Sequence, residues 1–350
     1  MAKKVYVGLS GGVDSSVTAA LLVRQGYEVI GVYMKNWSQD IPGYPCPWKE
    51  DYQDAKRVAV RLGIDFKVYD FQKQYRQKVV DYMVAEYQAG RTPNPDIMCN
   101  QEVKFKLFLK TALEDGADLI ATGHYAKTKN GKLYKAKDAN KDQTYFLYRV
   151  MENALKKTLF SLGDYTKPEV RELAKKFGLV TAGKKESMGI CFVGKVGIKE
   201  FLQQYVKTKS GKIIDNSLSS EGEIIGQHDG AIFYTIGQRH GLDVGGGLPY
   251  YVTGKDMKKN LVYVTTNLDD KNLWSKEINL TDMHWINAPP LQGATLMVRT
   301  RHRAPLVKCK LHHKQNVTTI TLDDEVRALT PGQSAVLYSK DECLGGGIVV

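Results

Sequence analysis

Two cysteine segments carry residue types that could perform sulfur chemistry. The first, TPNPDIMCNQEVKF at residues 92–105, places Cys99 behind a turn rich in Pro and Asn. Residues of these types fix a loop more than they fill a core. The second, SMGICFVG at residues 187–194, holds Cys191, with Lys184 and Lys185 shortly before it. Most cysteines outside disulfides are buried and inert. A nearby lysine or helix start would instead lower the pKa of a thiol and make it a nucleophile.

A loop rich in glycine and serine, SGGVDSS at residues 10–16, suggests phosphate binding. It stands between a predicted strand and a predicted helix, where backbone N–H groups can bind an anion. The P-loop pattern GxxxxGK[ST] is absent. The simpler alternative is a glycine turn in which Asp14 or Ser15 caps a helix. The loop resembles the pyrophosphate loop of the PP-loop ATP pyrophosphatases, which split ATP into AMP and pyrophosphate to adenylate a substrate.

These residues must be positioned by the elements around them. Apolar segments at 4–10, 28–34, 65–71 and 118–124 predict strands, and segments of helical periodicity separate them. Such alternation predicts an α/β fold with a parallel sheet covered on both faces, and ligands bind at the carboxyl ends of its strands. The phosphate loop, Met34 and Gly123–His124 would therefore meet at one edge of the sheet.

The alternation fades after about residue 150, and closely spaced strands dominate from about residue 272, which is typical of a small barrel or sandwich. We therefore expect three domains: an α/β catalytic domain at 1–206, a small central domain at 207–271 and a C-terminal domain resembling a β-barrel at 272–350.

The composition of the chain indicates which kinds of partner, cysteine chemistry and location to expect. A formal net charge of +12 favours a polyanion such as nucleic acid, although a solvated lysine-rich surface would give the same number. The alternation of Arg299, Arg301 and Arg303 would put three cations on one side of a strand, as an RNA footprint. Five irregularly spaced cysteines indicate neither a disulfide framework nor zinc. No apolar run is long enough to cross a bilayer, so a cytoplasmic protein without membrane contact is expected.

The two cysteine segments resemble those of the tRNA-specific 2-thiouridylase family, within the PP-loop superfamily. The resemblance extends over nearly the whole chain, through MKNW at 34–37, ATGHYA at 121–126, NKDQTYFLY at 140–148, YTIGQRHGL at 234–242 and the ending CLGGGIV. It implies a transferase that takes sulfur from a partner protein onto a cysteine persulfide and passes it to the wobble uridine of certain tRNAs, with ATP and Mg²⁺ as cofactors.

The resemblance also implies roles for individual residues. Cys191 would carry the persulfide, and Cys99 would be the second catalytic thiol, acting as acid or base or forming a disulfide with Cys191. Asn94, Pro95 and Asp96 would surround the target base. The ATP-binding residues would be Gly8, Leu9, Ser10, Gly11, Gly12, Val13, Asp14, Ser15, Met34 and Gly123. The residues in contact with tRNA would be His124, Lys141, Asp142, Gln143, Arg301, His302 and Gln333. The family often has a pair such as Arg-Tyr where this chain has Arg301-His302.

Three points stay open at this level. Asp14 could help place Mg²⁺ or could cap the helix. Cys46, in a loop bracketed by prolines, could join the other two thiols around an iron–sulfur cluster. The chain could assemble with copies of itself, although a monomer is expected.

Two other functions remain compatible with the sequence. A PP-loop enzyme that adenylates a carbonyl for attack by ammonia or an amine would need no cysteine. An RNA-binding protein could retain the nucleotide loop without catalysis.

Overall fold

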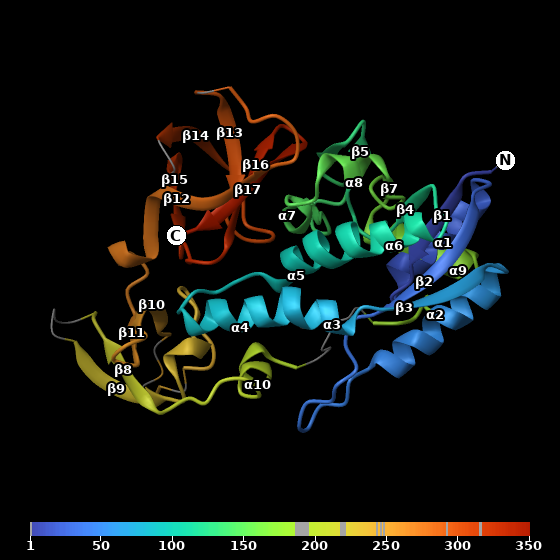
Figure 1. The fold of residues 1–350 in the computed structure, drawn as a ribbon. Helices are drawn as coiled ribbons and strands as arrows, with labels where there is room; N and C mark the ends of the chain where they lie inside the picture. The colour runs from blue at the N-terminus through green and yellow to red at the C-terminus, as the bar shows by residue number, and fades with distance from the viewer. Residues whose placement is uncertain are drawn as a thin grey trace.

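The computed structural model describes residues 2–185, 196–217, 222–242, 244–245, 247, 249–291, 293–314 and 317–350. The α/β part, the small central domain and the C-terminal barrel are distinct in Figure 1, and two long helical segments reach from the first toward the other two. Among the described residues, no helix is long and apolar enough to cross a membrane.

A five-stranded parallel sheet organises the N-terminal part. Its order is β3-β2-β1-β4-β7, and its strands are β1 (Lys4–Gly8), β2 (Glu28–Lys35), β3 (Asp65–Asp70), β4 (Leu119–Ala121) and β7 (Thr158–Leu159). The four predicted strands therefore all exist, although β4 is shorter than expected. Alternation along β1 separates two cores: Val5 and Val7 pack in one cluster, and Tyr6 packs in another.

Helices cover both faces of this sheet. Ala55, Val58 and Ala59 of α2 (Trp48–Leu62) pack with Val5 and Val7, together with Ala19 and Leu22 of α1 (Val13–Arg24). Helix α9 (Lys167–Lys176) packs against α1 and begins with a capping box between Thr166 and Glu169. The shorter helices α7 (Thr144–Leu147), α8 (Glu152–Lys156) and α10 (Ile198–Leu202) belong to the opposite core.

The two long segments on that opposite face contain π-helical turns. One runs through α3 (Gln72–Tyr75), η1 (Arg76–Val80) and α4 (Asp81–Gln88). The other runs through α5 (Pro95–Met98), η2 (Cys99–Phe108) and α6 (Leu109–Glu114). Both η1 and η2 have π-helical hydrogen bonding, which hydrophobic periodicity did not predict and which is frequent at functional sites.

The C-terminal domain is a closed antiparallel barrel, which decides between the barrel and the sandwich expected from sequence. Its strands are β12 (Trp274–Trp285), β13 (Thr295–Arg299), β14 (Val307–Lys314), β15 (Val317–Arg327), β16 (Ser334–Ser339) and β17 (Glu342–Val349), and β12 closes it by pairing with β17. A hairpin of the α/β part, β5 (Lys127–Lys129) with β6 (Lys132–Tyr134), extends the same sheet because Leu133 pairs with Cys343. Backbone hydrogen bonds therefore join the barrel to the catalytic part.

The central domain is a four-stranded sheet in the order β10-β11-β8-β9, formed by β8 (Gly211–Asp215), β9 (Glu223–His228), β10 (Tyr251–Asp256) and β11 (Leu261–Thr265). Two 3₁₀ turns flank it, η3 (Ala231–Phe233) and η4 (Lys271–Leu273). The α/β class with a central domain and a C-terminal barrel is thus confirmed.

Candidate nucleotide and thiol site

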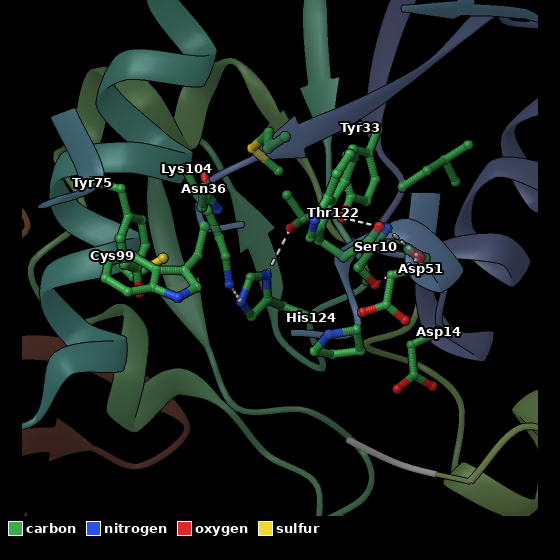
Figure 2. A pocket seen from close by; sticks show the side chains of 18 of the residues that line it. Ser10, Asp14, Tyr33, Asn36, Asp51, Tyr75, Cys99, Lys104, Thr122 and His124 are labelled. Carbon is green, nitrogen blue, oxygen red and sulfur yellow. Dashed lines mark hydrogen bonds between the residues drawn. The ribbon is translucent and has the colours of Figure 1, made fainter. Parts of the chain in front are cut away.

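One cavity of about 270 Å³ joins the two halves of the expected chemistry. It is lined at one end by the phosphate loop and at the other by Cys99, with Met34 and Gly123 between them. Figure 2 shows Ser10, Asp14 and Asp51 on one side and Cys99 with Tyr75 on the other. Parallel strands β1, β2 and β4 all end here, as expected for a ligand site in this fold.

The serines of the phosphate loop fix its conformation through hydrogen bonds within the loop. The Ser15 and Ser16 hydroxyls both donate to the Gly12 carbonyl, at 3.1 and 2.7 Å. The backbone N–H of Ser10 donates to Ser15 Oγ at 3.2 Å. Helix α1 begins directly behind this loop, so its first N–H groups face the cavity side of the sheet.

Glycine is required at two points because other backbone lies too close. A Cβ on Gly123 would stand 2.6 Å from the backbone nitrogen of Ser15. A Cβ on Gly11, which has φ +76°, would stand 2.4 Å from the carbonyl oxygen of Asp51. Gly123 therefore lets β4 seat against the first turn of α1, and Gly11 lets the loop pass over α2.

Asp14 does not cap helix α1, contrary to one expectation. The N-cap is Gly12, and Asp14 lies in the first turn. Both of its carboxylate oxygens accept from Lys167 Nζ, at 2.6 and 2.8 Å, and Tyr125 donates its hydroxyl at 2.9 Å. Both oxygens of the Asp14 carboxylate are therefore already engaged in hydrogen bonds. A magnesium ion would therefore enter with the phosphates of ATP more readily than on an isolated Asp14.

Cys99 follows a single turn of helix that the Pro and Asn residues set up. Asn94 is the N-cap of α5, and its side chain accepts from the N–H of Asp96 at 3.2 Å, with Pro95 at the first helical position. Cys99 is buried and lines the cavity. Burial raises the pKa of the nearby Asp96 carboxyl above its ordinary value, against the opposing charge of Lys104.

All three parts of the protein meet at the turn that precedes Cys99. The N–H of Thr92 donates to the Pro331 carbonyl at 2.8 Å, and Gln333 Nε2 donates to the Thr92 carbonyl at 2.9 Å. Thr92 Oγ1 also lies 3.2 Å from Thr235 Oγ1 of the central domain. Gln333, expected to contact tRNA, thus positions this turn.

His124 lies at the end of β4 with its ring buried between Phe105 and Phe160. Burial and the charge of Lys104 hold the pKa of His124 well below its ordinary value, so the ring is neutral. Nδ1 lies 2.8 Å from Thr122 Oγ1, and Nε2 lies 3.5 Å from Lys104 Nζ. Gln143 joins the same cavity, and its Oε1 accepts from the N–H of Tyr125 at 2.9 Å.

Cys191 lies outside the described residues, so its distance from Cys99 and their expected disulfide stay predictions. Lys184, which was expected to act on Cys191, is an ion-pair partner of helix α2: its Nζ is 2.8 Å from Asp51 and 2.6 Å from Asp54. The other thiols differ in setting. Cys46 lines the cavity, whereas Cys309 and Cys343 are buried in or beside the barrel and burial raises the pKa of both.

Several residues expected to contact tRNA have internal partners. Asp142 is buried, and it accepts from Thr144 Oγ1 and from Arg299 Nη1 at 3.2 Å. Arg301 Nη2 donates to the carbonyls of Ile236 and Ala328 and to Thr330 Oγ1, all within 2.9 Å. The geometry does not support a direct tRNA contact for the Asp142 carboxylate.

Arg299, Arg301 and Arg303 do not lie on one side of a strand as expected, because β13 ends at Arg299 and the chain then turns. Arg303 has φ +65° and donates to the Asn140 carbonyl. The His302 ring packs on Phe146, with centroids 4.5 Å apart, and burial lowers the pKa of His302 to about 4. At neutral pH His302 therefore offers a neutral ring. Lys141 lies beside these residues and is partly exposed.

Sequence reasoning missed several cavity residues, above all Lys104, and also Asn36, Tyr75 and Asp51. Asn36 could have been found, since it follows Met34 at the end of a predicted strand. Lys104 could not, because helical periodicity places it away from Cys99. Among the described residues, no three His, Cys, Asp or Glu side chains are grouped to hold a metal ion.

Comparison with known proteins gives one consistent family. A family model described as "tRNA methyl transferase HUP domain" matches residues 3–195. Models described as "tRNA methyl transferase PRC-barrel domain" and "Aminomethyltransferase beta-barrel domain" match residues 199–266 and 275–349.

Full-length relatives agree. The chain is 45% identical to a tRNA-specific 2-thiouridylase of Limosilactobacillus reuteri, over 99% of this chain and 95% of that relative. It is 46% identical to one of Listeria monocytogenes, over 99% of this chain and 94% of that relative. A solved complex of a 4-thiouridine synthetase with RNA and bound ATP is 22% identical, with a TM-score of 0.39 over 58% of this chain and 50% of that one, which is too distant to inform the site. On its sequence identity to relatives matched end to end, this chain belongs to the tRNA-specific 2-thiouridylase family.

Proposed function

We propose that this chain is a transferase that replaces the O2 oxygen of a wobble uridine in tRNA with sulfur, consuming ATP and releasing AMP and pyrophosphate. The observation that carries the proposal is the single cavity lined by both Ser15 of the phosphate loop and Cys99. Membership of the family supports tRNA as the substrate, and the formal net charge of +12 fits a polyanionic partner.

The first step is adenylation of the base. A carbonyl oxygen is a poor leaving group, so uridine O2 attacks the α-phosphorus of ATP and the bond to the bridging oxygen of pyrophosphate breaks. Pyrophosphate leaves with the electron pair. The N3 proton passes to Asp96, whose raised pKa suits a proton acceptor that must later return the proton. Gly8 to Ser15, Met34 and Gly123 hold the nucleotide.

The second step delivers sulfur. The terminal sulfur of a Cys191 persulfide attacks C2. The bond from C2 to the adenylated oxygen breaks, and that oxygen leaves with the electron pair as part of AMP. The Cys99 thiolate then attacks the inner sulfur of Cys191. The S–S electron pair moves to the sulfur on C2, N3 regains its proton, and a Cys99–Cys191 disulfide remains. An external dithiol reduces that disulfide, and a donor protein restores the persulfide.

The base must leave its stacked position to reach this cavity. Asn94, Pro95 and Asp96 form the turn that would surround it, and the contacts of Thr92 to the barrel and the central domain keep that turn in place. His124, Lys141, Gln143, Arg301, His302 and Gln333 stay candidates for tRNA contact, directly or by positioning. Mg²⁺ would accompany ATP, and we expect a cytoplasmic monomer with domains divided near residues 206 and 271.

Nucleoside mass spectrometry tests the proposal. Unmodified tRNA is incubated with Mg-ATP, a sulfur donor and reductant, using the wild type, Cys191→Ser and Cys99→Ser. Cys309→Ser serves as a matched control because that thiol is buried in the barrel core. One uridine oxygen should exchange for sulfur with the wild type and the control, and Cys191→Ser should abolish the exchange.

Other outcomes identify the alternatives. Pyrophosphate release and product formation with ammonia that survive Cys191→Ser would identify an amidating enzyme. Absence of tRNA-stimulated pyrophosphate release would identify a non-catalytic RNA-binding protein. A methylated nucleoside in place of a thiolated one would favour the reaction named in the family model. Loss of activity on removing iron would assign Cys46, Cys99 and Cys191 to a cluster.

A further inference from the structure

The cavity has few cationic side chains in its lining for a site that would bind a triphosphate. Asp14 and Asp51 contribute carboxylates that pair with Lys167 and Lys184, so those two lysines are already engaged, and His124 is neutral. Lys104 is the one lysine or arginine among the described residues that line the cavity. Enzymes that transfer adenylyl or phosphoryl groups rely on cations to neutralise the charge on the phosphorus oxygens. The phosphate loop itself supplies backbone N–H groups and hydroxyls, and no lysine.

The π-helical turns of η2 direct Lys104 into the cavity. Cys99 and Lys104 are five residues apart, which in an α-helix would separate their side chains by about 140° around the axis. With i→i+5 hydrogen bonds, residues five apart lie one turn apart on nearly the same face. Both side chains accordingly line the same cavity.

A buried pair of residues at the end of β4 holds the ammonium group from the other side. Nε2 of the neutral His124 faces Lys104 Nζ at 3.5 Å and therefore serves as acceptor. The ring proton is then on Nδ1, which donates to Thr122 Oγ1 at 2.8 Å. Figure 2 shows this chain of contacts between Lys104, His124 and Thr122, on the cavity side that leads toward Ser10.

We propose that Lys104 is a further catalytic residue, whose ammonium group contacts the α-phosphate of the nucleotide bound at the phosphate loop. The inference rests on the proposed function for its reaction step. As uridine O2 forms its bond to the α-phosphorus and the bond to pyrophosphate breaks, charge accumulates on the non-bridging oxygens, and Lys104 neutralises it. The same contact then stabilises AMP as the group that leaves C2. His124 and Thr122 are positioning residues that act through Lys104.

Nucleotide binding provides a test that does not depend on turnover. AMP carries the α-phosphate and adenosine lacks it, so calorimetric titration with each separates a phosphate contact from general damage to the site. Lys104→Met should weaken AMP binding about tenfold or more and leave adenosine binding unchanged. Lys104→Arg should restore part of the AMP affinity. The matched control is Lys106→Met, since Lys106 is on the same helix, largely exposed and paired with Glu102.

Kinetics then assign the step. Measured below the melting temperature of each protein, Lys104→Met should slow tRNA-dependent pyrophosphate release about 100-fold, whereas Lys106→Met should leave the rate unchanged. Equal loss of AMP and adenosine binding, or no loss of either, would overturn the inference. Phosphate-dependent binding through Lys104 in a protein that inserts no sulfur would overturn the proposed function and leave the Lys104 contact standing. Sulfur insertion by the wild type, together with unchanged AMP binding in Lys104→Met, would overturn the Lys104 contact and leave the proposed function standing.

Discussion

Asp14 and Lys167 form an ion pair that fastens helix α9 to the phosphate loop, with Lys167 Nζ 2.6 and 2.8 Å from the two carboxylate oxygens. Lys167 is nearly buried, and Asp14 stands next to Ser15, which shapes the loop. The pair therefore couples the seating of α9 to the geometry of the anion site.

Lys167→Met should lower the free energy of unfolding by about 2 kcal/mol, because the Asp14 carboxylate loses its cation in a partly buried setting. The double variant with Asp14→Asn should lose less than the sum of the two single variants, since the second change removes the stranded charge. Urea denaturation of the four proteins measures this coupling. Additive losses would show that the pair contributes little.

Gly123→Ala should abolish measurable ATP binding, because the new Cβ would stand 2.6 Å from the backbone nitrogen of Ser15 and would push α1 away from β4. Gly183→Ala is the matched control, since a Cβ there meets nothing within 4 Å. Titration with ATP compares the two. Normal ATP affinity in Gly123→Ala would mean that the loop does not depend on this close approach.

Asp142 and Arg299 form a buried ion pair between the catalytic part and the barrel. Asp142→Asn should lower the free energy of unfolding by about 3 kcal/mol while tRNA affinity, measured below the melting temperature, stays the same. Lys141→Met, at the neighbouring and more exposed position, should weaken tRNA binding and reduce its salt dependence. A drop in tRNA affinity for Asp142→Asn without loss of stability would restore Asp142 as a direct contact.

Local sequence signals explain why the nucleotide half of the site could be predicted. Strand β1, the loop at Ser10–Ser16 and helix α1 are consecutive, so periodicity and loop composition place them without tertiary information. Asn94 and Pro95 likewise predict the turn before Cys99 from their residue types alone.

The remaining features depend on tertiary contacts. The π-helical turns of η2, which bring Lys104 beside Cys99, leave no trace in hydrophobic spacing. Arg299 and Arg301 look like an exposed pair of cations, yet Asp142 lies 157 residues from Arg299 and the Ile236 carbonyl lies 65 residues from Arg301. The pairing of Leu133 with Cys343, which joins two domains, is equally non-local.

Asp96 should make the stability of the protein depend on pH in an unusual direction. Burial raises the pKa of its carboxyl in the folded state above the unfolded value, so the folded state binds the proton more tightly. The free energy of unfolding therefore falls as pH rises from the unfolded pKa through the folded pKa of Asp96, and this loss of stability is constant at higher pH. Asp96→Asn, which carries no charge, should raise the urea midpoint at pH 7, and the gain should vanish toward pH 4.

The opposing charge of Lys104 gives this prediction its control. Lys104 lowers the pKa of Asp96, so Lys104→Met should raise that pKa further and enlarge the gain from Asp96→Asn at pH 7. Denaturation curves for the wild type, the two single variants and the double variant between pH 4 and pH 8 measure both effects. A gain from Asp96→Asn that is the same at pH 4 and pH 7 would mean that removal of the charge is not its cause. A stability loss at pH 7 would mean that Asp96 is held as a stabilised carboxylate, and its proposed exchange of a proton with the base would fail.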